Sequence, residues 1–475
     1  MEKETSFKQS LGLLDATMIV AGSMIGSGIF IVSADIMRNV GSAGWLIVVW
    51  LITGFMTITA AVSYGELSGM FPKAGGQYVY LKEAFNPLMG FLYGWSLFSV
   101  IQTATIAAVA VAFARFSAYL FPALAETNIL FRMGNFQVSA AQVTAILLIV
   151  GLTYINTRGI REGKIVQTTF TTSKLLALFG LMLFGFVLVR HSFWAQNWPT
   201  DLHGMQDLGQ RVAGELQPTG WKPIAGVTLV GAIAAAMTGS VFSSDAWNNV
   251  TFIAGEIKNP SRNIGLSLFL GTLIVTILYV ATNMMYLNVL PIQEIAFPHQ
   301  DRLAVAAANA IFGDAGKLVI AILIMVSTFG CNNGLILAGS RVYYTMARDG
   351  LFFRKAGALN RHAVPQWALW IQCGMASLLC LSGRYGDLLD MIAFVVVIFY
   401  VLTIAGIFIL RKKLPDMPRP YRAFGYPVLP LLYMIVGIVF CIFLFLFKPL
   451  YTSIGFGIML VGIPLYYITI AGQKR

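Results

Sequence analysis

The stretch AGSMIGSGIF, residues 21–30, lies in the middle of the first long apolar segment and decides how the chain is interpreted. It holds three glycines and two serines within seven residues: Gly22, Ser23, Gly26, Ser27 and Gly28. Each glycine lowers helix propensity by about 1 kcal/mol relative to alanine, so the cluster favours a backbone that leaves the helix. A freed backbone group in lipid costs several kcal/mol unless it finds a partner, so the break indicates a bound polar solute.

The composition predicts an integral membrane protein. Of the 475 residues, 57% are hydrophobic and only 11% are charged, with a mean hydropathy of +0.76, whereas soluble domains carry about a quarter charged residues. Apolar runs of about 20 residues can cross a bilayer. The sequence contains twelve such candidate spans, at about residues 10–39, 44–70, 88–120, 137–157, 163–190, 224–256, 263–290, 303–346, 366–383, 387–410, 426–447 and 450–471. The predicted fold is all-α with 12 transmembrane helices.

The distribution of lysine and arginine predicts the orientation in the membrane. With the N-terminus inside, 21 of these residues lie at cytoplasmic ends of spans and nine at external ends. Positive flanks favour the cytoplasm, so both termini are expected there, in a multi-pass protein of the cell membrane. The same bias explains the net charge of +12, which is therefore not a nucleic-acid signal. No cleavable signal peptide is expected, because the first apolar run lacks a small-residue cleavage site.

Residues that carry redox or metal chemistry are poorly placed for it. The cysteines fall within spans, where this residue behaves as a small apolar group: Cys331, Cys373, Cys380 and Cys441. The histidines lie in loops and cannot hold a haem or a metal between helices: His191, His203, His299 and His362. No cofactor or metal is expected, and the chain is not expected to be an enzyme.

The loops are short except for residues 191–223, an external segment that separates five spans from five more. This division predicts a first repeat at 10–190, a second repeat at 224–411 and a final helix pair at 426–471. Transporters built from inverted repeats break the first helix of each half. The sixth span carries TGSVFSSDAWNN, residues 238–249, at a depth that corresponds to the glycine cluster of the first span.

Two such breaks suit a solute that carries both a negative and a positive charge. The N-terminus of a half-helix presents free N–H groups to a carboxylate, and freed carbonyls accept from an ammonium. An α-amino acid carries both groups on one carbon. The alternative is that Gly22 and Gly26 form a GxxxG face for helix packing, but the added Ser27-Gly28 and the matching segment in span six favour the break.

Five segments, in the right order and spacing, resemble the amino acid, polyamine and organocation superfamily, and within it the L-type amino-acid transporters. They are GSMIGSGIF (22–30), SYGELSGMFPKAGGQYVYLKEAF (63–85), NTRGIREGKIVQTTFTTSKLLAL (156–178), AWNNVTFIAGEIKNPSRNIGLSL (246–268) and NNGLILAGSRVYYTMARDG (332–350). The resemblance covers about residues 10–410. It implies a 5+5 inverted-repeat, LeuT-like fold with discontinuous helices 1 and 6 and the substrate between them.

The resemblance also implies which residues form the site. Backbone N–H groups after the first break take the substrate carboxylate, carbonyls take its ammonium, and an aromatic ring closes the site from outside as a lid. The matching residues are Ser27, Gly28 and Ile29 for the carboxylate, Ile25, Phe242 and Ser243 for the ammonium, and Phe242 for the lid, with Ser244 and Asp245 completing the substrate-binding set.

Lys174 lies mid-span in FTTSKLLALFG, where a charge costs at least about 2.5–3.5 kcal/mol on insertion scales. In sodium-coupled relatives a sodium ion links span one to span eight near this depth, and the resemblance places the lysine ammonium there instead. Lys174 is expected to donate to carbonyls around Gly22 or Ser23 and to Ser327 or Thr328 of span eight. Its charge repels sodium, which predicts sodium-independent transport; a lysine that snorkels to the interface is the alternative.

Asp245 departs from the pattern of neutral-selective members, which carry Gly-Gly where this chain has Asp245 and Ala246. Members that take basic and neutral amino acids also have an acidic residue at this position. The carboxylate could attract a cationic substrate side chain, pair with Lys174, or cap the second half-helix. Neutral amino acids are expected as substrates, with cationic ones as the alternative.

The predicted function is sodium-independent exchange of L-amino acids by alternating access. The alternatives are proton-coupled uptake of amino acids or polyamines on the same fold, and a transport-inactive nutrient sensor. The external loop at about 121–136 lacks the cysteine by which heteromeric members join a glycoprotein. No disulfide-linked heavy chain is therefore expected, and the predicted partners are small amino acids and the lipid bilayer.

Overall fold

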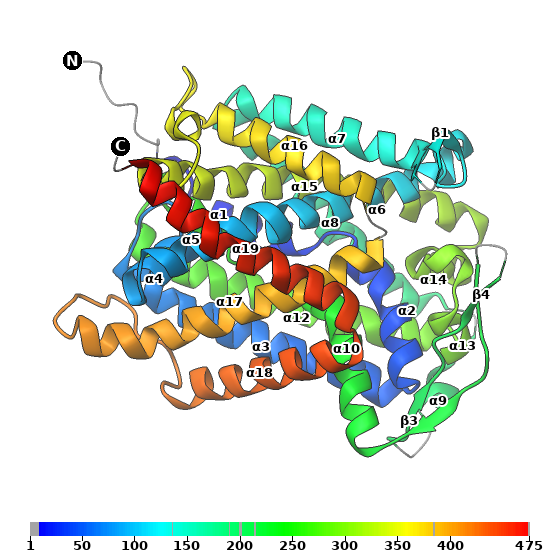
Figure 1. Ribbon diagram of the computed structural model, residues 1–475. Coiled ribbons are helices and arrows are strands. Elements are labelled where there is room, and N and C mark those ends of the chain that lie inside the picture. The colour runs from blue at the N-terminus through cyan, green and yellow to red at the C-terminus, as the bar shows by residue number, and fades with distance from the viewer. Residues whose placement is uncertain are drawn as a thin grey trace.

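The computed structural model of the protein describes residues 9–134, 136–189, 191–198, 202–212, 215–382 and 385–473. These residues form a bundle of long helices, with the labelled strands near one end (Figure 1). Ten segments within these ranges are long and apolar enough to cross a membrane, namely α3 (Ala43–Met70), α5 (Pro87–Ser96) joined to α6 (Gln102–Leu120), α7 (Ala140–Thr157), α8 (Ile160–Val187), α10 (Gly226–Ser243), α12 (Pro260–Val289), α15 (Asp314–Arg348), α17 (Tyr385–Lys413), α18 (Val428–Phe447) and α19 (Pro449–Gln473). The chain is therefore a helical, multi-pass membrane protein.

The first predicted span is a broken helix that adds an eleventh candidate. α1 (Leu13–Met24) and α2 (Gly28–Val40) together meet the requirement for a span and are bent by 43°. The apolar helix α16 (Gln366–Ser382), at the predicted ninth span, is shorter. The membrane class is thus confirmed, whereas the count of twelve spans and the inverted-repeat layout stay predictions.

The remaining elements are short and lie between the long helices. The helical ones are α4 (Gln77–Ala84), α9 (Trp194–Asn197), α11 (Asn249–Phe252), α13 (Ile292–Ala296), α14 (Leu303–Phe312), the π-helical η1 (Leu97–Ile101) and the 3₁₀ turns η2 (Pro122–Leu124), η3 (Ala254–Glu256), η4 (His299–Asp301) and η5 (Arg354–Gly357). The strands are β1 (Ile129–Met133), β2 (Phe136–Ser139), β3 (Gly204–Gln206), β4 (Gln210–Val212), β5 (Glu215–Gln217) and β6 (Lys222–Ile224). They pair antiparallel as β1–β2, β3–β6 and β4–β5.

Polar side chains start several of the long helices. The Ser42 hydroxyl accepts from the Trp45 N–H at 3.3 Å before α3, and the Asn86 side chain accepts from the Met89 N–H at 3.0 Å before α5. Ser139 starts α7 with a capping box. Such caps satisfy N–H groups that have no partner within the helix, which matters most at a membrane surface.

The first break, residues 25–27, follows directly from the glycine cluster. α1 ends at Met24, and Ile25 leaves the helix with φ −75° and ψ 90°. The Gly26 N–H turns back to the Met24 carbonyl at 2.9 Å, and α2 begins at Gly28. Ser27 follows as the N-cap of α2 and itself has helical backbone angles.

The second break, residues 244–248, interrupts the predicted sixth span. α10 ends at Ser243, and only the single turn of α11 and the 3₁₀ turn η3 follow it. Ala246 has φ 63°, in the left-handed region, which costs a residue with a Cβ about 1–2 kcal/mol. Strain of this kind persists only where the surroundings hold it, and it concentrates at functional sites.

Helix packing brings the two breaks together. α10 packs along α2, α1 packs against α12 and α8, and α15 packs against α6 and α8. α10 and α2 are neighbours at the end of the bundle that carries β3 and β4 (Figure 1). α18 and α19 have only 28% of their most apolar residues buried, so they lie at the periphery and leave the central positions to the broken helices.

The predicted external loop is fastened to α2. The Asp207 N–H donates to the Arg38 carbonyl at 2.9 Å, and the backbone of Met205 fills the space where a Cβ on Gly41 would lie. Asp207 itself is buried and ties the far side of the loop: its carboxylate accepts from the Thr219 hydroxyl at 2.8 Å and from the Gly220 N–H at 2.8 Å. One carboxylate therefore organises the loop that rests on α2.

The loop should loosen in acid. Burial acts to raise the pKa of Asp207, but hydrogen bonds from the Thr219 hydroxyl and from the N–H groups of Gly220, Thr219 and Gly209 outweigh it and hold the pKa below its usual range. A lowered folded pKa stabilises the loop above the unfolded value of about 4, and this stabilisation is lost as the pH falls through the folded value. We expect hydrogen-exchange protection of residues 215–224 to fall over that window, and Asp207→Asn to reduce it at least about tenfold at neutral pH. Unchanged protection in Asp207→Asn would contradict this role.

Candidate functional site

The two breaks touch each other inside the bundle. Gly28, at the start of α2, lies against Ser243, at the end of α10: a Cβ built on Gly28 would lie 3.0 Å from the Ser243 Cα and would overlap its hydroxyl. The contact therefore requires glycine. The hydroxyl of Tyr279, on α12, lies 3.1 Å from the Met24 carbonyl and 2.9 Å from the Ser243 carbonyl. A single side chain thus holds the ends of α1 and α10 together.

A small cavity lies at this contact, and we call it the head-group cavity. Its volume is about 10 Å³, whereas a typical ligand pocket has about 300 Å³ or more. Six of the predicted site residues line it: Ser23, Ser27, Gly28, Phe242, Ser243 and Asp245. The other predicted site residues are not part of its lining: Gly22, Ile25, Ile29, Lys174 and Ser244. Binding a solute here requires the two breaks to move apart.

The backbone around the head-group cavity carries opposite partial charges. α2 begins at Gly28, so its first N–H groups and the positive end of its dipole lie at the cavity, and α10 ends there with its negative end. Within the described residues, the N–H groups of Gly28 and Ile29 have no recorded backbone acceptor. A molecule with a carboxylate and an ammonium on neighbouring atoms matches this arrangement.

Lys174 is fully buried and binds the first break. Its Nζ donates to the carbonyl of Gly22 and, at 2.6 Å, to that of Ile25. The Ile25 carbonyl also accepts from the Ser327 hydroxyl at 3.4 Å, so in this conformation it is not free for a substrate ammonium, contrary to the prediction. Among the described residues, Lys174 donates no hydrogen bond to span eight itself but shares the Ile25 carbonyl with Ser327 of that span, and Thr328 bonds its own helix.

Asp245 does not pair with Lys174. Its carboxylate accepts from the Tyr400 hydroxyl and from the Ala246 N–H. It is 6% exposed, and no cationic nitrogen of the described residues lies within 4.0 Å of it. Asp245 lines the head-group cavity and also the two small cavities beside it. Of the three predicted roles, pairing with Lys174 is absent here, capping is met by one N–H, and recognition of a substrate side chain stays open.

The two sides of the site differ in access. On the side predicted to be external, a cavity of about 650 Å³ reaches Val32 and Gly239, each one helical turn from the contact between Gly28 and Ser243. On the other side, a buried ion pair joins Arg341 to Glu256 at 3.0 Å. The described residues thus show, on the predicted outer side, a cavity that ends one helical turn from the site and, on the predicted inner side, a buried ion pair.

The inner ion pairs were only partly predictable. The sequence predicts that Glu66 and Glu256, at the inner ends of spans two and six, pair with residues such as Lys73, Arg262 or Arg341. The structure confirms Arg341 for Glu256. The Glu66 carboxylate instead accepts from Arg411 at 2.7 Å, and Arg419 lies 3.5 Å away. These arginines come from the end of α17 and the loop after it, 345 residues or more along the chain, which no local pattern indicates.

Several residues at the site escaped the sequence analysis. Cys331 lines the head-group cavity and its thiol lies 3.1 Å from the Ser23 carbonyl, although cysteines were expected to be apolar filling. Sequence reasoning did not single out Tyr279 or Tyr400. A tyrosine hydroxyl inside an apolar span was the feature that could have indicated them. The side-chain oxygen of Asn333 accepts from the Asn156 amide at 2.8 Å.

Comparison with known proteins identifies the family. The family model described as amino acid permease matches residues 11–470. The chain belongs to the amino acid permease family. The predicted resemblance to the superfamily of amino acid, polyamine and organocation transporters is thereby confirmed. Within the described residues, no group of three or more His, Cys, Asp or Glu could hold a metal ion.

Three relatives show where this permease lies within the family. The human large neutral amino acids transporter small subunit 2 is 30% identical over 482 residues, 99% of this chain and 82% of the relative. The Asc-type amino acid transporter 1 of mouse is 27% identical over 475 residues, 100% of this chain and 83% of the relative. The serine/threonine exchanger SteT of Bacillus subtilis is 28% identical over 478 residues, 100% of this chain and 98% of the relative. The family and these relatives are amino-acid transporters, not enzymes.

Proposed function

We propose that this permease exchanges L-amino acids across the cell membrane, without sodium, by alternating access. The observation that carries the proposal is the contact of Lys174 with the first break: its ammonium donates to the Gly22 and Ile25 carbonyls. Carbonyl oxygens of a broken membrane helix are the groups that coordinate a sodium ion in transporters of this architecture. A lysine ammonium that occupies them leaves no ligands for the ion and repels it.

The head group of the substrate binds between the two breaks. The N–H groups of Ser27, Gly28 and Ile29 take the carboxylate at the positive end of α2. The carbonyls of Phe242 and Ser243, at the negative end of α10, take the ammonium. Support comes from the head-group cavity, which Ser27, Gly28, Phe242 and Ser243 line. The Ile25 carbonyl contributes through its bond to Lys174 rather than by contact with the substrate.

Phe242 is the external lid. It lines the head-group cavity and is 6% exposed, and it lies one helical turn below Gly239, where the outer cavity ends. When the Phe242 ring closes, it separates the outer cavity from the head group of the substrate. Gly22 and Ser23, whose carbonyls bind Lys174 and Cys331, transmit the movement of α1 to α8 and α15.

Neutral amino acids are the proposed substrates, and cationic ones are the second candidate. The relatives support the first choice, since one is named for large neutral amino acids and another for serine and threonine. The cationic candidate rests on Asp245, a buried carboxylate with no cation within 4.0 Å in the described residues. A buried charge is costly unless it is paired, and a cationic substrate would supply the missing partner.

The permease works without a disulfide-linked heavy chain, and both its termini lie in the cytoplasm. The loop between α6 and α7 contains no cysteine for such a link, although one relative is named as a small subunit. The orientation rests on the excess of lysine and arginine at one side of the spans. Proton-coupled uptake of amino acids or polyamines remains the alternative mode, and a transport-inactive sensor is a remote one.

Counterflow in proteoliposomes tests the proposal. Labelled neutral amino acid outside should enter vesicles that contain unlabelled amino acid, at the same rate in sodium and in choline buffer, because no sodium ligands are free. Empty vesicles should accumulate little label. Uptake into empty vesicles that a pH gradient drives would replace exchange by proton coupling. No transport of any amino acid would leave polyamine uptake and the sensor as the alternatives.

A further inference from the structure

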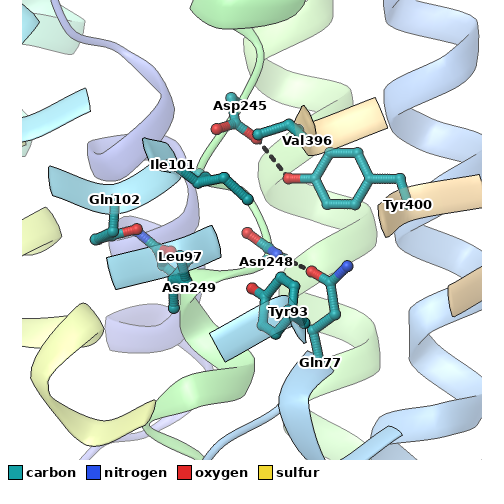
Figure 2. A pocket seen from close by; sticks show the side chains of 11 residues that line it. Gln77, Tyr93, Leu97, Ile101, Gln102, Asp245, Asn248, Asn249, Val396 and Tyr400 are labelled. Carbon is teal, nitrogen blue, oxygen red and sulfur yellow. Dashed lines mark hydrogen bonds between the residues drawn. The ribbon is translucent and has the colours of Figure 1, made fainter. Parts of the chain in front are cut away.

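A polar pocket lies beside the head-group cavity. Figure 2 shows its side chains, which come from the second break, from α11 directly after it, and from α4, α5, η1, α6 and α17. Asp245 and Ala246 line both this pocket and the head-group cavity. A substrate whose head group binds between the breaks therefore has this pocket in reach of its side chain. We call it the side-chain pocket.

Some polar groups of the side-chain pocket already bind one another. The Asn248 amide donates to the Gln77 side chain at 2.8 Å, and Gln77 donates to the Thr403 hydroxyl at 2.9 Å. The Tyr400 hydroxyl donates to one oxygen of Asp245. Figure 2 shows the bond between Asn248 and Gln77 and the bond between Tyr400 and Asp245, on the side of the pocket that α4 and α17 form. These bonds hold the side chains on this side of the pocket in place. They leave the polar groups on the opposite side to bind another partner.

The opposite side holds unused hydrogen-bonding capacity. The amide nitrogen of Asn249 has no partner in the described residues, and the residue is 1% exposed. Gln102 donates to the Leu335 carbonyl at 2.8 Å, and the described residues provide no recorded donor to its oxygen. An unpartnered buried amide is uncommon and calls for an occupant that can accept from it. The side-chain pocket thus offers one free donor and at least one free acceptor.

This free donor and free acceptor determine which chemical group can bind in the side-chain pocket. A carboxamide has an oxygen that accepts from the Asn249 amide and an NH₂ group that donates to Gln102 or to the second oxygen of Asp245. An ammonium can pair with Asp245, but it has donors only and therefore leaves the Asn249 donor unpaired. An alkyl chain satisfies none of these groups, and buried polar groups left unpaired are the strongest basis for rejecting an analogue.

We propose that the side-chain pocket recognises the carboxamide of glutamine or asparagine. The proposal rests on the proposed function, because it needs an amino-acid head group between the breaks. Asn249 and Gln102 are the specificity-determining residues, and Asp245 assists as an acceptor. Neither Asn249 nor Gln102 is needed to hold the second break, because no side-chain bond of either residue reaches residues 244–248.

Competition in the counterflow assay tests the proposal. Glutamine, norleucine and lysine compete with a labelled neutral amino acid in wild type, Asn249→Leu and Asn249→Asp. We expect glutamine to compete at least about tenfold better than norleucine or lysine in wild type, a difference of about 1.4 kcal/mol. Asn249→Leu should remove the preference over norleucine. Asn249→Asp, which replaces the free donor by an acceptor, should shift the preference toward lysine.

Asn332→Leu is the matched control. Asn332 is fully buried, and both its amide atoms lack partners in the described residues, but it lines neither the side-chain pocket nor the head-group cavity. The ratio of glutamine to norleucine should be unchanged in this variant. If Asn249→Leu does not fold, Gln102→Leu and the thermal shift that each amino acid gives the wild type replace it.

The two proposals fail in different ways. If no amino acid supports counterflow, the proposed function fails. If counterflow occurs but norleucine or lysine competes as well as glutamine in wild type, or if Asn249→Leu keeps the wild-type ratio, the assignment of the side-chain pocket is overturned while the exchange function stands.

Discussion

Replacing Lys174 by alanine is expected to lower the rate of counterflow at least about tenfold, and up to about a hundredfold, while the protein still folds. The reason is the loss of two hydrogen bonds from a charged donor to the Gly22 and Ile25 carbonyls, each worth about 1.5–3 kcal/mol. Without them, α1 keeps its packing against α8 but loses both hydrogen bonds to it, and the Ile25 carbonyl keeps only the weaker contact with Ser327. The measurement is initial counterflow at matched amounts of reconstituted protein.

Lys317→Ala is the control for this experiment. Lys317 pairs with Asp314 at 2.8 Å on the same helix, and the carboxylate is 94% exposed, so solvent screens this bond and it contributes little to stability. Counterflow in this variant should match wild type. Near-normal turnover in Lys174→Ala would refute the role of the lysine. A rate that becomes sodium-dependent in Lys174→Ala would support it, because the vacated carbonyls are ion ligands.

Replacing Gly28 by alanine is expected to abolish transport. The added methyl group would overlap the Ser243 hydroxyl and lie 3.0 Å from the Ser243 Cα. Backbone on both sides would have to shift, because the clash involves a Cα and not only the end of a flexible side chain. Such overpacking typically costs about 1–3 kcal/mol of stability. It also displaces the N–H of Gly28 from the substrate carboxylate, so we expect no measurable substrate-dependent thermal shift and no counterflow.

Gly151→Ala separates this effect from a general response to alanine. Gly151 lies within α7, and a Cβ there meets no atom of another residue within 4 Å. Since alanine is the better helix former by about 1 kcal/mol, this variant should be as stable as wild type or slightly more stable, with unchanged counterflow. Substrate binding that survives in Gly28→Ala would show that the contact between the breaks is not part of the site.

The break of the first span was predictable because its cause is local. Gly22, Gly26 and Gly28 lie within seven residues of sequence, and the helix ends among them. The burial of Lys174 could be predicted in the same way, since a charge within an apolar run must find polar partners in the protein. These predictions needed only composition, spacing and the cost of polar groups in lipid.

The partners that complete the site could not be predicted from local sequence. Tyr279 reaches both breaks from α12, Tyr400 reaches Asp245 from α17, and Cys331 reaches the Ser23 carbonyl from α15. Which face of each helix meets the breaks depends on helix packing across the whole bundle. The side-chain pocket could not be predicted for the same reason. Asn249 lines it together with Gln102, which lies 147 residues earlier in the sequence.

The attachment of the external loop to α2 has a consequence for inhibition. The loop touches the half-helix at Arg38 and also reaches α13, where the Trp221 ring N–H donates to Gln293 at 2.9 Å. The loop therefore contacts both α2 and α13 on the side predicted to be external. An antibody fragment that binds this loop from the outside would restrain α2. We expect it to slow the proposed exchange without competing with an amino acid for the binding site.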